Sequence, residues 1–309
     1  MHGDAAVASS AVTNRLADSN YAVSTRVAFS GTRVNSFALT HRKSMRGHAH
    51  RRRSPVVARR FVPALVGALI GAAVALPALA GGECAAHSLA TLTPVVELYT
   101  SEGCSSCPPA DRWLSTLKGP AAEGRAVVQA FHVGYWDYIG WVDRFAAPAY
   151  TNRQRGIAKA NHQSGIYTPQ LVRNGRDWRD WGGTNPISNE EPARASIAIK
   201  RRASGPDGDR FEAEVTPTAG ADTAWSAYWS VTENGHSSKV KAGENAGENL
   251  NHDFVVRQYV PVGDYRGPAR LSFSSIAADP AYPRQVNLVV FDPRSGNPMQ
   301  ALSLSCAAG

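Results

Sequence analysis

The sequence has 309 residues, of which 43% are hydrophobic and 19% charged, enough apolar material for more than one compact part. Its formal net charge of +8 is uneven, because 11 of the 33 Lys and Arg residues but only two of the 25 acidic residues lie in residues 1–60. The rest of the chain holds 22 basic and 23 acidic residues. This balance argues against a nucleic-acid-binding surface.

The N-terminal part predicts export. Residues Phe61–Ala80 are uncharged, rich in Ala and Gly, and end in Ala-Leu-Ala, which fits a signal peptide cleaved before Gly81. A membrane anchor is the alternative, since 20 uncharged residues can span a bilayer. The basic segment that follows Met45 suggests that Met45 is the true start. We therefore expect residues 1–80 to be a disordered leader and signal peptide, and the mature protein to be periplasmic or secreted and free of the membrane.

A strand followed by a Cys-Ser-Ser-Cys motif is expected next. Val95–Tyr99 are mostly β-branched or aromatic, and Cys104 and Cys107 follow after a short polar loop. The two prolines after Cys107 suit the first turn of a helix, so the cysteines should open one. Free amides and the helix dipole would then lower the pKa of Cys104, and the pair could cycle between dithiol and disulfide. A static disulfide and half of a zinc site are the alternatives.

Two further cysteines lie near the ends of the exported part, Cys84 and Cys306. Four cysteines allow three pairings, and loop length favours Cys104 with Cys107. An exported protein enters an oxidising compartment, and the termini of compact proteins often lie close together. We therefore expect a structural disulfide between Cys84 and Cys306.

Ala126–Val133 reads as a buried strand, which would pair in parallel with the first strand across the helix. A segment dense in aromatic and acidic residues follows, at the edge where open α/β sheets place their sites. Its candidate substrate-binding residues are Trp136, Asp137, Tyr138 and Trp141, although buried aromatics more often belong to a core. His132 and Asp143 are candidates for titration near the dithiol.

A helix is expected over Ala146–His162, and a strand over Ile166–Val172 that is entered through Pro169 and ends at a tight Asn174-Gly175 turn. From about Ser196 onward, short segments alternate apolar and polar residues and are separated by loops with Gly, Pro or Asp. They predict an antiparallel, sandwich-like β domain. The Gly243–Leu250 loop reads as a hairpin turn, with Glu244, Asn245 and His252 as residues that could also reach a site.

Four segments together resemble a bacterial secreted thioredoxin-like family catalogued as domain of unknown function 1223. They are VVELYTSEGCSSCPPAD, FHVGYWDYIGWVDRF, YTPQLVRNG and GENAGENLNHDFVVR, and the resemblance runs from about Pro94 to the C-terminus. It implies a thioredoxin-like α/β domain over residues 81–191, followed by the β domain over residues 192–309. By analogy with the thioredoxin fold, Thr168-Pro169 should be a cis peptide beside the cysteines. Gly134 stands where the family usually has Asp.

The function that these features predict is thiol-disulfide exchange, without a cofactor, on a protein or peptide substrate. Cys104 should be exposed and attack, Cys107 should lie one turn into the helix and resolve, and Thr168 should align the substrate by backbone hydrogen bonds. One rival hypothesis is a copper-handling module in which Cys104, Cys107 and His132 hold a soft ion. Another is a binding protein in which the cysteine pair is a permanent brace.

Overall fold

The computed structural model describes residues 84–183, 187, 190–218 and 223–306, which form one compact unit. The expected leader, signal peptide and cleavage site lie outside the described residues. A helix long and apolar enough to cross a membrane is not found within these ranges.

The chain is mostly β-structure. Its helices are α1 Pro108–Ser115, α2 Lys118–Ala122 and α3 Pro148–Ala160, with a 3-10 helix η1 Gly134–Ile139. Its strands are β1 Ala85–His87, β2 Val95–Thr100, β3 Val127–His132, β4 Gln170–Arg173, β5 Arg176–Asp177, β6 Ala195–Ala203, β7 Arg210–Pro217, β8 Ala224–Glu233, β9 His236–Lys239, β10 Asn249–His252, β11 Val255–Arg266, β12 Ala269–Ser274, β13 Arg284–Phe291 and β14 Pro298–Leu304.

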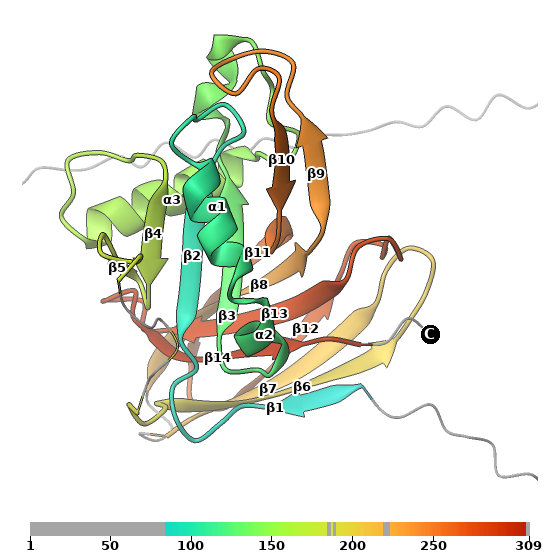
Figure 1. The fold of residues 1–309 in the computed structure, drawn as a ribbon. Helices are drawn as coiled ribbons and strands as arrows, with labels where there is room; N and C mark the ends of the chain where they lie inside the picture. Colours follow the sequence, from blue (N-terminus) through green and yellow to red (C-terminus); the bar gives the residue numbers. More distant parts are fainter. Residues whose placement is uncertain (1–83, 184–186, 188–189, 219–222, 307–309) are drawn as a thin grey trace, which may run out of the picture. The chain divides into compact units, whose positions relative to one another are not determined.

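An eight-stranded mixed sheet carries the candidate site, in the order β14-β13-β8-β11-β3-β2-β4-β5 (Figure 1). β2 and β3 pair in parallel, as expected, and β4 pairs with β2 antiparallel. Every residue of β2 and β3 is buried, which explains why the two strands are mostly apolar. Because the two strands run in parallel, the segments that follow them emerge at the same edge of the sheet.

A second sheet, β1-β6-β7-β12, packs against β8, β13 and β14 through the largest hydrophobic core. Within this core the rings of Trp229 and Phe273 stack with their centroids 5.0 Å apart. Its neighbouring strands pair antiparallel, so the expected sandwich-like arrangement of two β layers is present. The disulfide between Cys84 and Cys306 is confirmed, with the two Cα atoms 5.7 Å apart, and both residues pack against this core.

The large sheet crosses the boundary that we expected near residue 191. β8, β11, β13 and β14 continue the sheet that β2, β3 and β4 begin, and the two parts join where Val255 of β11 lies beside Ala130 of β3. The alternating pattern identified strands of the C-terminal part, but it could not show that one of them would pair with β3. β11 itself was not predicted, because Pro261 and two register shifts interrupt its pattern.

Candidate functional site

The Cys-Ser-Ser-Cys loop leaves the end of β2 and leads into α1. The amide of Cys104 donates to the Ser101 carbonyl at 3.1 Å, and the amide of Cys107 donates to the Cys104 carbonyl at 3.1 Å. Cys107 is the N-cap residue of α1, and two prolines occupy the first positions of the helix, as predicted. Cys107 therefore lies at the boundary of the helix rather than one turn inside it, and Cys104 lies in the turn before.

Both thiols are free, and both are buried. The exposed fraction is 1% for Cys104 and 0% for Cys107, so the expectation that Cys104 would be exposed was wrong. The 3-10 helix η1 covers one side of the cysteine loop. It packs so closely that a Cβ atom placed on Gly103 would lie 2.9 Å from the Cβ atom of Trp136. Glycine is required at this position because η1 packs directly on the loop backbone.

The second cover is the loop Gly243–Leu250, which joins β9 to β10 and lies far away in sequence. The Glu244 carboxylate accepts hydrogen bonds from the amide of Ser105 at 3.0 Å and from its hydroxyl at 2.8 Å. The Asn245 side chain donates to the carbonyls of Glu102 at 2.8 Å and Cys104 at 3.1 Å. The sequence suggested this loop only as a candidate, and the structure makes it both a hairpin turn and a clamp on the cysteine loop.

The two thiols have opposite acidities. Hydrogen bonding to the Cys107 thiol, with help from the hydroxyls of Ser106 and Thr168, lowers the pKa of Cys104 to about 6 although burial opposes this shift. Burial, reinforced by the proximity of Cys104, strongly raises the pKa of Cys107. Cys104 is therefore a thiolate at neutral pH and Cys107 a protonated donor. The neighbouring thiol is the largest cause, and a backbone hydrogen bond from Ser106 contributes less.

The aromatic candidates have different environments. Trp136 donates from its indole nitrogen to the Thr168 hydroxyl at 2.7 Å, and the Thr168–Pro169 peptide bond is cis, as expected. Trp141 instead donates to the Glu102 carboxylate at 2.7 Å, and Tyr138 projects from η1 with 81% of its surface exposed.

Asp137 supports the loop that follows η1. Its carboxylate accepts from the amide of Asp143 at 3.2 Å, and burial raises its pKa. Among the predicted residues, Thr168 lies beside Cys104 and Trp136 beside Gly103, while Trp141 and Asp137 hold the surrounding loops.

A buried cluster of titratable side chains lies behind the cysteine loop: Glu102, Asp111, His132, Asp143 and His252. The rings of His132 and His252 meet edge to face, with their centroids 4.8 Å apart. Burial by itself would lower the pKa of His252, but the carboxylates of Asp111 and Glu102 raise it to about 9.

Sequence reasoning singled out His132, Asp143 and His252 but missed Glu102 and Asp111. The signal for both was present, since Glu102 comes two residues before Cys104 and Asp111 lies one helical turn after Cys107. Within the described ranges, one group of side chains has the spacing to hold a metal ion: Asp111, His132 and His252. Cys104 and Cys107 do not belong to it.

A family model described as a protein of unknown function, DUF1223, matches residues 95–291. The chain belongs to the DUF1223 family. It is similar to the crystal structure of protein AGR_C_4864 from Agrobacterium tumefaciens, with 24% identity and a TM-score of 0.53 over 72% of this chain and 98% of that one. It is also similar to HBP35 of Porphyromonas gingivalis, with 14% identity and a TM-score of 0.49 over 71% of this chain and 76% of that one. A search of curated proteins gave no match.

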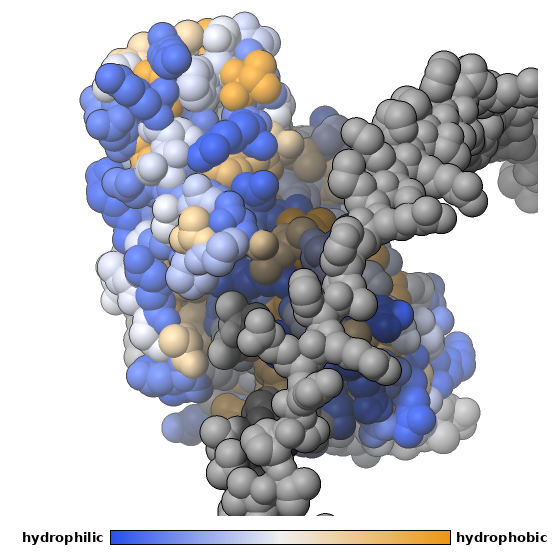
Figure 2. Space-filling view, turned by 90° about the vertical axis from the view of Figure 1, so that its right-hand side faces the viewer, coloured by the Kyte–Doolittle hydropathy of each residue, from blue (hydrophilic) through white to orange (hydrophobic). Residues whose placement is uncertain are grey.

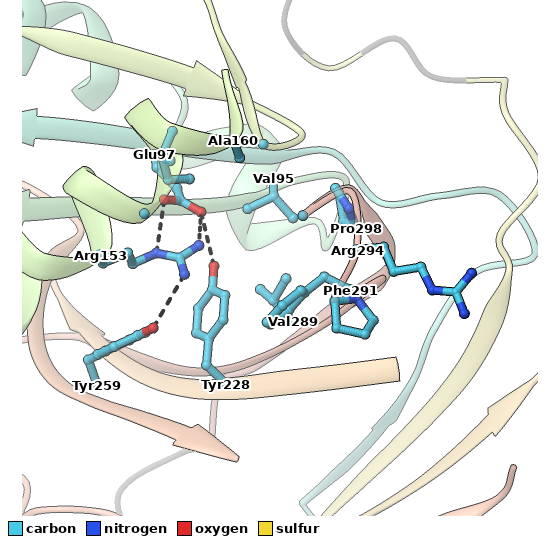
Figure 3. Close-up of a pocket in the computed structure, with 15 residues that line it drawn as sticks. Val95, Glu97, Arg153, Ala160, Tyr228, Tyr259, Val289, Phe291, Arg294 and Pro298 are labelled. Carbon is cyan, nitrogen blue, oxygen red and sulfur yellow. Dashed lines mark hydrogen bonds and ion pairs between the residues drawn. The ribbon is translucent and has the colours of Figure 1, made fainter. Parts of the chain in front are cut away.

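This DUF1223 member also has a cavity of about 320 Å³ between α3 and the large sheet, lined in part by the first half of β2 (Figure 3). The Arg153 guanidinium donates to both carboxylate oxygens of Glu97 and to the Tyr259 hydroxyl, while Tyr228 also donates to Glu97. These buried polar groups pair with one another, and Val95 and other apolar side chains complete the wall. The chemistry of the DUF1223 chain is therefore better sought at the cysteine loop.

Proposed function

We propose that this protein is an exported, thioredoxin-like thiol-disulfide oxidoreductase that uses Cys104 and Cys107 and needs no cofactor. Its substrates would be protein or peptide disulfides or thiols, with no role for nucleic acid or a membrane. The observation that carries the proposal is the pair of free cysteines at the start of α1. The lowered pKa of Cys104 and the raised pKa of Cys107 fit it. Only the thiolate form of a cysteine attacks a disulfide.

The local fold supports this proposal. β2, α1, β3, α3 and β4 follow one another in the order expected of a thioredoxin-like unit, and the cysteine pair stands between β2 and α1. The disulfide between Cys84 and Cys306 supports the proposed location, because such bonds persist in oxidising compartments.

The proposed exchange proceeds in two steps. The Cys104 thiolate attacks one sulfur of a substrate disulfide, forms a mixed disulfide and releases the other substrate sulfur as a thiolate, which takes up a proton. Cys107 then loses its proton, attacks Cys104 and releases the second substrate thiol. Two electrons pass from the dithiol to the substrate, and the reverse sequence oxidises a substrate dithiol.

A substrate must displace part of the cover over Cys104, because only 1% of this residue is exposed. The adjoining surface offers Tyr138 and Val142, which are 81% and 70% exposed, as apolar contacts for a partner. Figure 2 shows one face of the molecule, on which small hydrophobic groups stand among hydrophilic residues at the upper end.

The direct test is a redox titration of the Cys104 and Cys107 pair in glutathione or dithiothreitol buffers. We expect reversible two-electron behaviour within the range of known exchange proteins, from about −120 to −270 mV. In parallel, Cys107→Ser should trap mixed disulfides through Cys104, and Cys104→Ser should trap few. A pair that strong reductants leave oxidised, or equal trapping by the two variants, would contradict the proposal.

A further inference from the structure

Three buried side chains from three different elements converge behind the cysteine loop. Asp111 belongs to α1, His132 ends β3 and His252 ends β10. One ligand atom from each lies within 4.8 Å of the other two. The exposed fractions of the three residues are 7%, 0% and 3%.

The inner nitrogen atoms of the two histidines have no hydrogen-bond partner. His132 uses Nδ1 to meet the Asp143 carboxylate at 2.7 Å, and its buried Nε2 is left unpaired. His252 Nδ1 lies 3.7 Å from Asp111 Oδ1, and this nitrogen also lacks a hydrogen bond. Unpaired polar atoms in a protein interior are costly, so their convergence calls for a missing partner.

The outer nitrogens are arranged as in metal sites. His132 Nδ1 faces Asp143, and His252 Nε2 lies 3.3 Å from Glu102 Oε1. A histidine that binds a metal through one nitrogen commonly presents the other to a carboxylate, which fixes the ring and its tautomer. Both histidines have such a carboxylate, on the side away from Asp111.

We propose that Asp111, His132 and His252 bind a divalent transition-metal ion, for which Zn²⁺ is the best fit, and that Asp143 and Glu102 orient the two imidazoles. Two imidazoles and one carboxylate form a donor set that Zn²⁺ uses in proteins. Tetrahedral ligands about 2.1 Å from a metal lie about 3.4 Å apart. Separations of up to 4.8 Å must therefore shorten by up to about 1.4 Å when the ion binds.

The charges of the cluster also favour a cation. In the described part of the chain, the ion pairs of Glu102, Asp111 and Asp143 run to His132 or His252. Three carboxylates thus face two imidazoles, which leaves a negative charge even when both rings are protonated. A divalent ion would compensate this charge in a buried setting, where uncompensated charge is strongly unfavourable.

A protonated His252 bridging Asp111 and Glu102 is the competing explanation. It accounts less well for the geometry, because neither His252 nitrogen makes a hydrogen bond and both separations exceed the usual length of a charged one. It also leaves His132 Nε2 without a role.

The test uses the full exported chain with Cys104→Ser and Cys107→Ser, so that the dithiol cannot bind metal and the outcome is independent of the redox proposal. Because the site is buried, the protein is refolded with one equivalent of Co²⁺ or Zn²⁺ and passed through a desalting column. We expect one bound ion per chain and Co²⁺ ligand-field bands without thiolate charge-transfer absorption. A chain that retains no ion after refolding would overturn the proposal.

Variants in the same background locate the ion. His132→Gln should weaken Co²⁺ binding at least tenfold, and Asp143→Asn should weaken it about 10- to 100-fold, the usual range for a residue that orients a ligand. His236→Gln is the matched control, because His236 is buried at 3% exposure and pairs with Glu233 at 2.8 Å but lies outside the cluster. Near-ultraviolet circular dichroism checks that each variant folds. Binding that survives in folded His132→Gln, or that falls equally in His236→Gln, would refute the assignment.

Discussion

The acidity of Cys104 can be tested by changing its neighbour. Hydrogen bonding to the Cys107 thiol is the largest of the effects that lower the pKa of Cys104 to about 6. A hydrogen bond to a charged group contributes about 1.5–3 kcal/mol, which corresponds to about 1–2 pKa units. Cys107→Ala should therefore move the pKa of Cys104 to about 7–8, whereas Cys107→Ser keeps a donor and should change it less.

The assay is the pH dependence of Cys104 alkylation by iodoacetamide, followed by mass spectrometry with the Cys84 disulfide intact. The midpoint is the informative quantity, because a thiolate of higher pKa is also more nucleophilic and this partly offsets its smaller population at pH 7. Near-ultraviolet circular dichroism controls for folding. A wild-type midpoint at or above about 8.5, the value of an ordinary thiol, would refute the reasoning, as would identical midpoints in wild type and Cys107→Ala.

The sign of the effect on stability follows from the direction of the shift. The pKa of Cys104 is lower in the folded protein than in the unfolded chain, so ionisation favours the folded, reduced state. This contribution is fully present above the unfolded pKa of about 8.5 and is lost as the pH falls through about 6. Urea denaturation of the reduced dithiol at pH 5 and pH 8 should show most of it, as a larger loss of stability at pH 5 in wild type than in Cys104→Ser.

Three further predictions concern the structure around the site. Cys84→Ala removes a disulfide between residues 222 positions apart, and should lower the free energy of unfolding, measured in urea, by about 5 kcal/mol. A loss below about 1 kcal/mol would contradict the loop-entropy argument. Asn245→Ala removes two hydrogen bonds to the cysteine loop and should accelerate alkylation at pH 8, whereas the exposed Glu248→Ala in the same turn should not. Arg153→Ala leaves the carboxylate of Glu97 buried and should cost about 3–5 kcal/mol in thermal or urea denaturation, so an unchanged stability would contradict the buried ion pair.

Much of the fold could be predicted because its signals are local. Mostly apolar runs identified β2 and β3, and the prolines after Cys107 placed the start of α1. At the turn after β4, Asn174 and Gly175 have φ angles of 49° and 78°, which Asn and Gly tolerate best. The candidate site was predicted less completely, since the cysteine pair was recognised but its burial was not.

The sequence by itself determined the cysteine pair, the helix that it introduces and the residue types of the site, because these depend on neighbours within a few positions. Tertiary structure decided the rest. Only folding brings Glu244 and Asn245 onto the cysteine loop, where they bind Ser105 and Cys104 at sequence separations of 139 and 141. Only tertiary packing brings α1, β3 and β10 together, so that His132 and His252 meet Asp111. These long-range contacts determine the burial of the cysteines, their pKa values and the cluster of possible metal ligands. No pattern within a single segment predicts such contacts.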